Sequence, residues 1–445
     1  MESINNGNSG HSIYFDPSKC NGDMACLRIC PVEAIRVRNR KSYMLPEKCI
    51  DCGVCVQACK SKAIIPLTNS FTDLSSFKYT IAIPSLSIYS QFDRHITPDV
   101  ILSALKKIGF NEVVDITKAC VTVYKAIKKY LNDNKGRKPL ICTFCPTCLR
   151  LIHTKYPELI QHVIPVISPI ELAAREARIE YAKRYRVKKE EIGIIYITPC
   201  PSRLALISQE DENYYPSFDG AIPITDIYNS LYAAINTTLK DRHNGTEHFA
   251  MNGFGLHFGY LGGLSYMLGT NNHITISGIN NVQFLLDEID KGKLSNIEFV
   301  EMNSCQEACT GGSLVVENAY MAVNKMKYLI DEFGEKKLPI GKKDDTDINS
   351  VYSDSIFPSI NGEQNNVDLE DAIGKISKRN EIYSQLMKIN CSACGSPTCM
   401  SFAEDVVHDE ANMNDCIFVQ NEELKHKLKE KIMTILELQQ KLNEK

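Results

Sequence analysis

The sequence predicts an α+β protein of several domains, and three observations lead to this prediction. The chain has 445 residues, more than one hydrophobic core usually serves. Its 18 cysteines gather in tight groups instead of spreading evenly along the chain. Between about residues 78 and 335, apolar runs typical of strands alternate with amphipathic runs typical of helices. This alternation indicates an α/β domain with a mainly parallel sheet.

The composition excludes several classes of protein. With 44% hydrophobic and 23% charged residues, the chain has enough apolar material for a core and is neither disordered nor collagen-like. A net charge of −4 gives no basic character that would indicate a nucleic-acid partner. No apolar run approaches about 18 residues, and the first residues lack the pattern of a secretory signal. We therefore expect a cytoplasmic protein without a transmembrane segment.

The cysteine spacing points to metal. Tight C-x-x-C groups bring thiolates onto one centre, whereas disulfide scaffolds spread cysteines over a small loop-rich chain. Residues 11–70 hold an internal repeat, in which Cys20, Cys26 and Cys30 recur as Cys49, Cys55 and Cys59. The second copy is a full C-x2-C-x2-C-x3-C run, the pattern of bacterial two-cluster ferredoxins.

In that pattern the fourth cysteine of each run ligates the other cluster. One predicted [4Fe–4S] cluster is therefore held by Cys49, Cys52, Cys55 and Cys30. The other is held by Cys20, Cys26, Cys59 and Asp23, the aspartate standing where the repeat predicts a cysteine. Carboxylate holds iron less tightly than thiolate in a sulfur-rich site, so we expect this cluster to interconvert between four-iron and three-iron forms. The alternatives are that Asp23 is a surface residue, or that the whole region is a zinc ribbon.

The last cysteine group predicts one more [4Fe–4S] cluster, in a small helical domain over residues 372–420. Its spacing is C-x2-C-x4-C-x16-C, with apolar residues at helical intervals before the fourth cysteine. This segment resembles the small four-iron domain found beside electron-transfer and hydrogenase-like proteins; structural zinc is the alternative. The expected ligands are Cys391, Cys394, Cys399 and Cys416.

Residues 78–335 form the predicted α/β domain. Strands are expected over 79–85, 141–144 and 192–200, and helices over 99–110, 121–131, 171–185 and 282–289. In such domains ligand sites gather at the carboxyl ends of parallel strands. Cys145 and Cys200 each come directly after a predicted strand.

Three segments of this domain resemble the signature motifs of the catalytic domain of [FeFe]-hydrogenases: C-T-F-C-P-T-C, I-T-P-C-P-S-R and E-M-N-S-C-Q-E-A-C-T-G-G. The stretch over 276–309 is most similar to the sensory branch of that family, and the resemblance covers most of residues 15–420. It implies that the cubane half of an H-cluster is held by Cys145, Cys200, Cys305 and Cys309, with Cys309 bridging to a two-iron subsite that bears carbon monoxide and cyanide. The alternative is a plain [4Fe–4S] cluster at the same cysteines.

Several positions depart from the motifs of the catalytic relatives. Phe144 replaces the cysteine that passes protons to the subsite, and Arg203 replaces the lysine that hydrogen-bonds a cyanide. Asn303 and Thr198 stand where methionines are usual, and Ser313 interrupts a run of glycines. Cys142 is a candidate substitute for the missing thiol, or, like Cys148, a small buried hydrophobe. The changes to the proton path and the subsite predict slow turnover or none.

Two segments have no place in the metal sites. Residues 336–371 are rich in Asp, Asn and Ser, and this composition predicts a linker or insertion. Residues 421–445 predict an amphipathic or coiled-coil helix with an apolar seam in 4-3 spacing, interrupted by Lys431, at Leu424, Leu428, Ile435, Leu438 and Leu442. Three roles are open for this helix: it forms a homodimer, it contacts a signalling partner, or it packs on its own domain.

These observations predict an iron–sulfur redox protein of an anaerobe. Three accessory clusters would exchange electrons with a redox partner, a ferredoxin or an oxidoreductase subunit, while Arg203 and Cys142 serve the central site. The predicted function is slow hydrogen activation, or sensing of hydrogen or redox state. The alternative is an electron-transfer or assembly protein that carries only ordinary [4Fe–4S] clusters.

Overall fold

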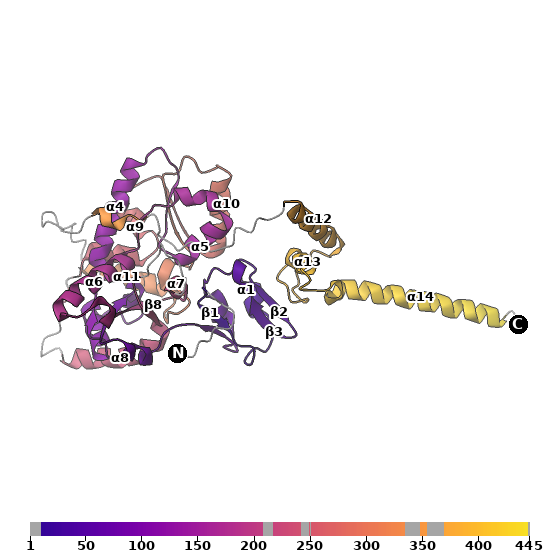
Figure 1. Cartoon of the computed structure of the whole chain (residues 1–445), viewed down its shortest axis with the longest axis horizontal. Coiled ribbons are helices and arrows are strands. Elements are labelled where there is room, and N and C mark those ends of the chain that lie inside the picture. Colours follow the sequence, from indigo (N-terminus) through magenta and orange to yellow (C-terminus); the bar gives the residue numbers. More distant parts are fainter. Residues whose placement is uncertain are drawn as a thin grey trace. The chain divides into compact units, whose positions relative to one another are not determined.

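The computed structural model describes residues 10–207, 217–241, 249, 251–333, 348–353 and 369–443. The chain divides into two compact units. Unit 1 comprises residues 1–14, 50–53 and 65–360, and unit 2 comprises residues 15–49, 54–64 and 361–445. Figure 1 labels their main helices and strands. Two short strands, β1 (Ile13–Phe15) and β4 (Ile64–Pro66), pair with each other where the chain passes from one unit to the other.

Unit 1 contains two parallel sheets. The first has the order β6-β5-β8-β9, with β5 (Tyr79–Pro84) and β8 (Ile192–Thr198) in its centre. Nearly every residue of these two strands is buried, as expected for strands covered on both faces. The edge strands are β6 (Glu112–Val113) and β9 (Gly220–Pro223). The second sheet has the order β10-β11-β7, made of β10 (His273–Ser277), β11 (Phe299–Asn303) and β7 (Leu140–Cys142).

The helices of unit 1 begin and end at residues suited to those positions. In α6, the Ser168 hydroxyl accepts the Glu171 N–H at 3.3 Å and Pro169 occupies the first turn, while Arg186 at the end has a φ of 56°. The α-helices of the unit are α3 (Pro98–Lys107), α4 (Thr117–Asp133), α5 (Pro146–Lys155), α6 (Pro169–Tyr185), α7 (Ser202–Ile207), α8 (Ile224–Lys240), α9 (Gly263–Leu268), α10 (Ile279–Asp290) and α11 (Ala319–Phe333). Short 3-10 turns join them, among them η7 (Gly253–Gly259), η8 (Ala308–Gly311) and η9 (Ile348–Val351).

Unit 2 combines the N-terminal cysteine repeat with the C-terminal cysteine domain. The repeat supplies two one-turn helices and an antiparallel hairpin: α1 (Ala25–Ile29), α2 (Val54–Ala58), β2 (Ile35–Arg38) and β3 (Lys41–Met44). The C-terminal part supplies α12 (Leu369–Gln385), α13 (Cys399–Val407) and α14 (Ile417–Asn443). Its small core is formed by Ile382, Leu386, Phe402, Ala403 and Cys416.

The structure confirms the predicted fold class, a multidomain α/β arrangement with parallel sheets and a helical C-terminal region. Within the described ranges, no helix is both long and apolar enough to cross a lipid bilayer. Of the predicted linker over 336–371, only residues 348–353 and 369–371 are described. Figure 1 shows α14 as a single long helix, and its seam residues Leu424, Leu428, Ile435 and Leu438 are exposed. The predicted partner of this helix stays a prediction, which sedimentation velocity of the full chain can test.

Candidate functional site

Unit 1 contains a cavity of about 110 Å³ bordered by the carboxyl ends of β7, β8 and β11. Open α/β folds place their ligand sites at such strand ends. The structure therefore brings together the cysteines that were predicted to share a central site, and adds residues that were not. Lining residues able to take part in chemistry are Cys52, Cys142, Cys145, Cys200, Arg203, Glu301, Asn303, Cys305 and Cys309.

Each of the four predicted ligands lies in a turn or at the end of a helix or strand. Cys145 is the N-cap of α5, and Cys200 lies just before α7. Cys305 follows β11, and Cys309 lies in η8. Between these last two, Glu307 and Ala308 have φ values of 56° and 59°, a left-handed conformation that is uncommon without glycine. Such a turn persists only where its surroundings hold it, so this loop has one defined shape.

Three glycines let the backbone approach closely around the cavity. A Cβ on Gly312 would collide with the carbonyl oxygen of Pro199, beside Cys200. One on Gly311 would collide with the carbonyl oxygen of Gln306. Gly53, which follows Cys52, has a φ of +74°, and its Cβ would lie 2.8 Å from Cγ of Pro201. Four thiolate donors from separate segments, held by close-packed backbone, fit a bound iron–sulfur cluster.

Cys145 is the best prepared of the four thiols to act as a ligand. A hydrogen bond from Cys148 lowers the pKa of Cys145 to about 5, despite the opposing effect of burial. The Ser304 hydroxyl lies 3.1 Å from the Cys145 Sγ, and the start of α5 also favours a thiolate. This contact gives Cys148 a role that its sequence did not reveal.

Arg203 links two of the cysteine-bearing motifs. Its Nη2 donates to the carbonyl oxygen of Phe144 at 2.7 Å, and its Nη1 donates to the Ser168 hydroxyl at 3.3 Å. The side chain is buried and lines the cavity. The guanidinium therefore fixes the loop before Cys145 relative to α7. Its predicted role toward a cyanide ligand stays a prediction.

Three further residues that differ from the catalytic motifs, Phe144, Thr198 and Ser313, are placed by the structure as follows. The Phe144 ring packs against Phe258, with ring centres 6.0 Å apart, and borders the cavity with carbon and hydrogen only. Thr198 is fully buried; its hydroxyl donates to the carbonyl oxygen of Cys200 at 2.6 Å and accepts the N–H of Cys200 at 3.2 Å. The Ser313 hydroxyl is buried and has no partner among the described residues.

Cys142 lies beside a buried acid that sequence reasoning missed. The strand expected over 141–144 ends at Cys142, so Phe144 lies outside it. Cys142 instead pairs in register with Glu301 of β11, and both border the cavity. Burial and the nearby Glu301 charge raise the pKa of Cys142, and burial raises the pKa of Glu301. A lone acid within the apolar run FVEMN, just before Cys305, was the available sequence signal.

A chain of hydrogen bonds connects Glu301 with the edge of its sheet. Its carboxylate accepts the N–H groups of Gly262 at 3.0 Å and Ser265 at 2.9 Å, and the Ser265 hydroxyl at 2.6 Å. The Ser265 hydroxyl in turn lies 3.1 Å from that of Thr275, which is partly exposed on the edge strand β10. Glu301, Ser265 and Thr275 thus form a hydrogen-bonded chain from the wall of the cavity to a partly exposed residue.

Within unit 1, a buried ionic network holds the loop over residues 50–53, which carries Cys52. Asp51 is buried and accepts hydrogen bonds from Arg150 of α5, and from the N–H and hydroxyl of Ser12 at 2.8 and 3.0 Å. Nδ1 of His11 lies 2.8 Å from the same carboxylate. Burial alone would raise the pKa of Asp51, but the contacts with His11 and Arg150 outweigh it and lower the pKa. Because Arg150 follows Cys145 on α5, this network ties the loop bearing Cys52 to the loop bearing Cys145.

In unit 2, the cysteines of the repeat lie around α1 and α2. Cys26 and Cys55 are buried, whereas Cys20, Cys30, Cys49 and Cys59 are partly exposed. The Sγ atoms of Cys30 and Cys59 accept the N–H groups of Ala34 and Ala63, both at 3.2 Å, as thiolate ligands commonly do. The two copies of the sequence repeat therefore make the same N–H to sulfur hydrogen bond at equivalent cysteines.

Asp23 is exposed, and its carboxylate accepts the N–H of Ala25 at 3.0 Å. This contact lies just before α1, whose N-cap is Met24, and the predicted role of Asp23 as an iron ligand stays a prediction.

The C-terminal cysteines border one hollow next to the small helical core. The lining residues include Cys391, Cys394, Cys399 and Cys416. The Thr398 hydroxyl accepts the N–H of Ser401 at 3.0 Å and so begins α13 directly at Cys399. Four thiols from two loops and a helix start meet here, which fits a single metal cluster.

Comparison with protein-family models matches three separate parts of the chain. Residues 78–267 match "Iron only hydrogenase large subunit, C-terminal domain". Residues 12–60 match "4Fe-4S dicluster domain", and residues 386–418 match "Putative Fe-S cluster". The matches fall on the segments that carry the predicted cysteine ligands, except that the first one ends before Cys305.

Individual relatives share parts of this arrangement. The periplasmic [Fe] hydrogenase large subunit of Nitratidesulfovibrio vulgaris is 28% identical over 210 residues, which cover 43% of this chain and 50% of that protein. A ferredoxin of Mycobacterium tuberculosis is 43% identical over 42 residues, which cover 9% of this chain and 37% of that protein. The chain thus spans half or less of the length of these curated relatives. A solved variant of [FeFe]-hydrogenase HydA1 from Chlamydomonas reinhardtii has 14% identity and a TM-score of 0.41, covering 57% of this chain and 84% of that one.

The family matches establish an iron–sulfur protein related to [FeFe]-hydrogenases, with a 4Fe–4S dicluster domain at its N-terminal end and a further Fe–S cluster domain near its C-terminal end.

Proposed function

We propose that unit 1 binds an iron site of the [FeFe]-hydrogenase kind and that the protein activates hydrogen slowly, in order to sense hydrogen or redox state. The observation that carries the proposal is the placement of Cys145, Cys200, Cys305 and Cys309 around one cavity at the carboxyl ends of three strands. When bound, such a site supplies the reversible conversion of H2 into two protons and two electrons. Three accessory cluster sites on the remaining cysteines would carry the electrons to and from a redox partner.

The residues of this chain support slow proton movement. Phe144 borders the cavity but has no group that can hold a proton. We assign the proton route instead to Cys142 and Glu301, which pair in register and both border the cavity. A proton held on the Glu301 carboxylate can pass to the Ser265 hydroxyl, 2.6 Å away, and from there toward Thr275. Burial disfavours the charged forms of both Cys142 and Glu301, so each transfer has a barrier that an exposed relay would lack.

Replacing Glu301 with glutamine should lower the rate of H2/D⁺ exchange by about 10²-fold, the usual scale of a lost acid–base group. Iron content should stay the same, because Glu301 is not among the predicted ligands. Mass spectrometry of the gas phase measures the exchange. The matched control is Glu298→Gln at the exposed start of the same strand region, where the carboxylate pairs with Lys138. Equal rates of H2/D⁺ exchange in Glu301→Gln and in the control would show that Glu301 is not part of the proton route.

Infrared spectroscopy tests the function itself. The chain is produced anaerobically together with hydrogenase maturation enzymes, and the spectrum is recorded under argon and under hydrogen. We expect bands of iron-bound carbonyl and cyanide that change under hydrogen. If the iron and sulfide of all the predicted clusters are present without such bands, the hydrogenase proposal fails.

That second outcome would favour the alternative, an electron-transfer or assembly protein with an ordinary cluster in unit 1. A specific observation supports this alternative: Phe144 and Arg203 both differ from the residues of the catalytic motifs, and Arg203 is engaged with Phe144 and Ser168.

A further inference from the structure

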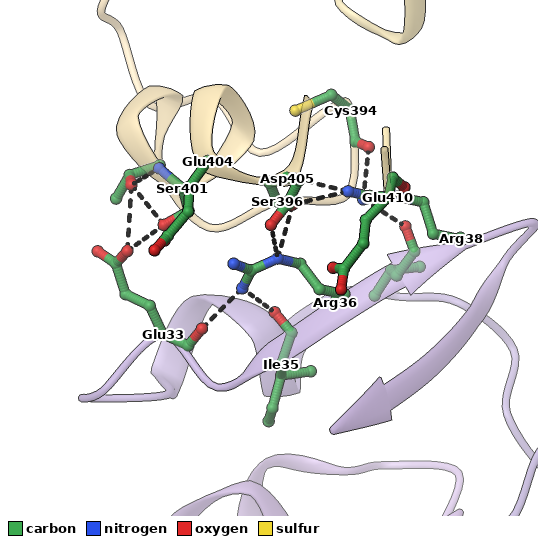
Figure 2. Close-up of polar contacts among 12 residues, drawn as sticks. Glu33, Ile35, Arg36, Arg38, Cys394, Ser396, Ser401, Glu404, Asp405 and Glu410 are labelled. Atoms are coloured by element: carbon green, nitrogen blue, oxygen red, sulfur yellow. Dashed lines mark hydrogen bonds and ion pairs between the residues drawn. The ribbon is translucent and has the colours of Figure 1, made fainter. Parts of the chain in front are cut away.

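In unit 2, a buried ionic network joins the N-terminal cysteine repeat to the C-terminal cysteine domain (Figure 2). Nε of Arg36 donates to both carboxylate oxygens of Asp405, at 2.8 and 2.7 Å. Nη2 of Arg38 donates to the same carboxylate at 2.8 Å, and the Ser396 hydroxyl donates at 2.6 Å. The side chains of Arg36 and Asp405 are 0% and 2% exposed, so this is a closed interface and not a surface ion pair.

The network reaches the backbone of a predicted ligand loop. Nη1 of Arg38 donates to the carbonyl oxygen of Cys394 at 3.0 Å, and the N–H of Val37 donates to that of Gly395 at 2.9 Å. Gly395 has a φ of +80°, and a Cβ there would collide with the carbonyl oxygen of Val37. The Cys394 loop therefore lies against β2 with no room for a side chain between them.

The remaining contacts lie close to two cysteines of the repeat, Cys30 and Cys49. The Glu33 carboxylate accepts hydroxyl hydrogens from Thr398, at 3.2 Å, and from Ser401, and the N–H of Glu33 donates to the carbonyl oxygen of Cys30 at 3.3 Å. Lys48, which precedes Cys49, pairs with Glu404 at 2.7 Å. Cys30 and Cys49 belong to the same predicted cluster.

One buried nitrogen of the Arg36 guanidinium, Nη2, makes no hydrogen bond to the described residues. Its Nη1 donates to the carbonyl oxygens of Glu33 and Ile35, at 2.6 and 3.1 Å, but its Nη2 has no partner among the described residues. A buried N–H without an acceptor is costly, and the thiolates and sulfides of a bound cluster are acceptors.

We propose that Arg36, Arg38 and Asp405 are positioning residues that couple the cluster site of the C-terminal domain to the site held by Cys30 and Cys49. The Asp23 site then lies off this route. The inference depends on iron–sulfur clusters occupying both sites, which is part of the proposed function, but not on hydrogen chemistry in unit 1. One electron given up at one site is taken up at the other, with no bond made or broken and no proton moved. The electron comes from an external one-electron reductant, for which dithionite serves as the probe.

Electron paramagnetic resonance of the dithionite-reduced full chain tests the coupling. We expect the signals of the C-terminal and Cys30 sites to be split and broadened by each other. Asp405→Asn should weaken that splitting severalfold while the iron content stays the same. Asp409→Asn, an exposed aspartate of the same domain, is the control and should leave the splitting intact. An unchanged splitting in Asp405→Asn would overturn the proposal.

Two further variants complete the test. Glu33→Gln alters the edge of the interface without leaving a buried arginine unpaired, so it should also weaken the splitting if Asp405→Asn fails to fold. Cys26→Ala removes a predicted ligand of the Asp23 site and should leave the splitting in place. Loss of the splitting in Cys26→Ala would show that the C-terminal site couples to the Asp23 site, which contradicts the proposal. Missing carbonyl bands in the infrared spectrum would affect the proposed function alone.

Discussion

Replacing Cys305 with alanine should remove the central cluster and about six iron atoms per chain, four from the cubane and two from the proposed two-iron subsite. Cys305 follows β11 directly and borders the cavity together with Cys145 and Cys200. The cubane would lose one of its four thiolates. We expect none of the other thiols that border the cavity, Cys52, Cys120 and Cys142, to replace it, because they lie on other segments of the chain. Iron and sulfide analysis of the anaerobically purified protein gives the count, and the carbonyl bands expected for the parent should be absent.

The matched control is Cys120→Ala. Cys120 is also a buried thiol that borders the same cavity, but it lies in the first turn of α4 and belongs to no motif. Its removal should leave the iron count at the parent value. If Cys120→Ala loses as much iron as Cys305→Ala, then thiols of this cavity affect iron through folding, and the ligand assignment is wrong.

Replacing Asp51 with alanine should destabilise the loop over residues 50–53 and α5 by about 3–5 kcal/mol, the usual effect of leaving a buried charge unpaired. Arg150 has a side-chain exposure of only 5% and would keep its charge without the carboxylate that now balances it. The loss would be local, because Asp51 contacts the N-terminal segment and α5. Hydrogen exchange followed by mass spectrometry resolves such local opening, and peptides from α5 should exchange faster.

Asp93→Ala serves as the comparison for this prediction. Asp93 is an exposed aspartate of the same unit, and its carboxylate accepts the N–H of His95 at 3.0 Å. Its replacement should change stability by no more than about 0.5 kcal/mol. Similar exchange in α5 for both variants would mean that the Asp51 network contributes nothing beyond an ordinary surface aspartate.

The sequence predicted those parts of the structure that depend on neighbours along the chain. The strands before Cys145 and Cys200 were placed to within a few residues, because buried parallel strands are continuous apolar runs with β-branched residues. The helix after Cys399 was also expected, since its apolar residues recur at helical spacing. These features are local, and local pattern is what a single sequence records best.

The missed features depend on pairing between distant segments. Glu301 reaches Cys142 only through the register of β11 with β7, which no spacing within either strand records. The same holds for Asp51 with Arg150, and for the approach of Cys52 to the central cavity. Arg36 lies in the short strand β2 beside a second arginine, Arg38, and its partner Asp405 is 369 residues away. The acid within the apolar run FVEMN was an available signal, but the partners of these charged residues could be identified only from the tertiary structure.

The distance along the chain between Arg36 and Asp405 also has a consequence for synthesis. A ribosome adds roughly 5–20 residues per second, so Asp405 leaves it some 20–70 s after Arg36. During that interval the nascent N-terminal repeat carries an arginine for which the finished protein provides a buried carboxylate. The repeat therefore reaches its final packing only after the last part of the chain has been translated. Iron delivered to this repeat before translation ends would meet a site that is still open on the side of β2.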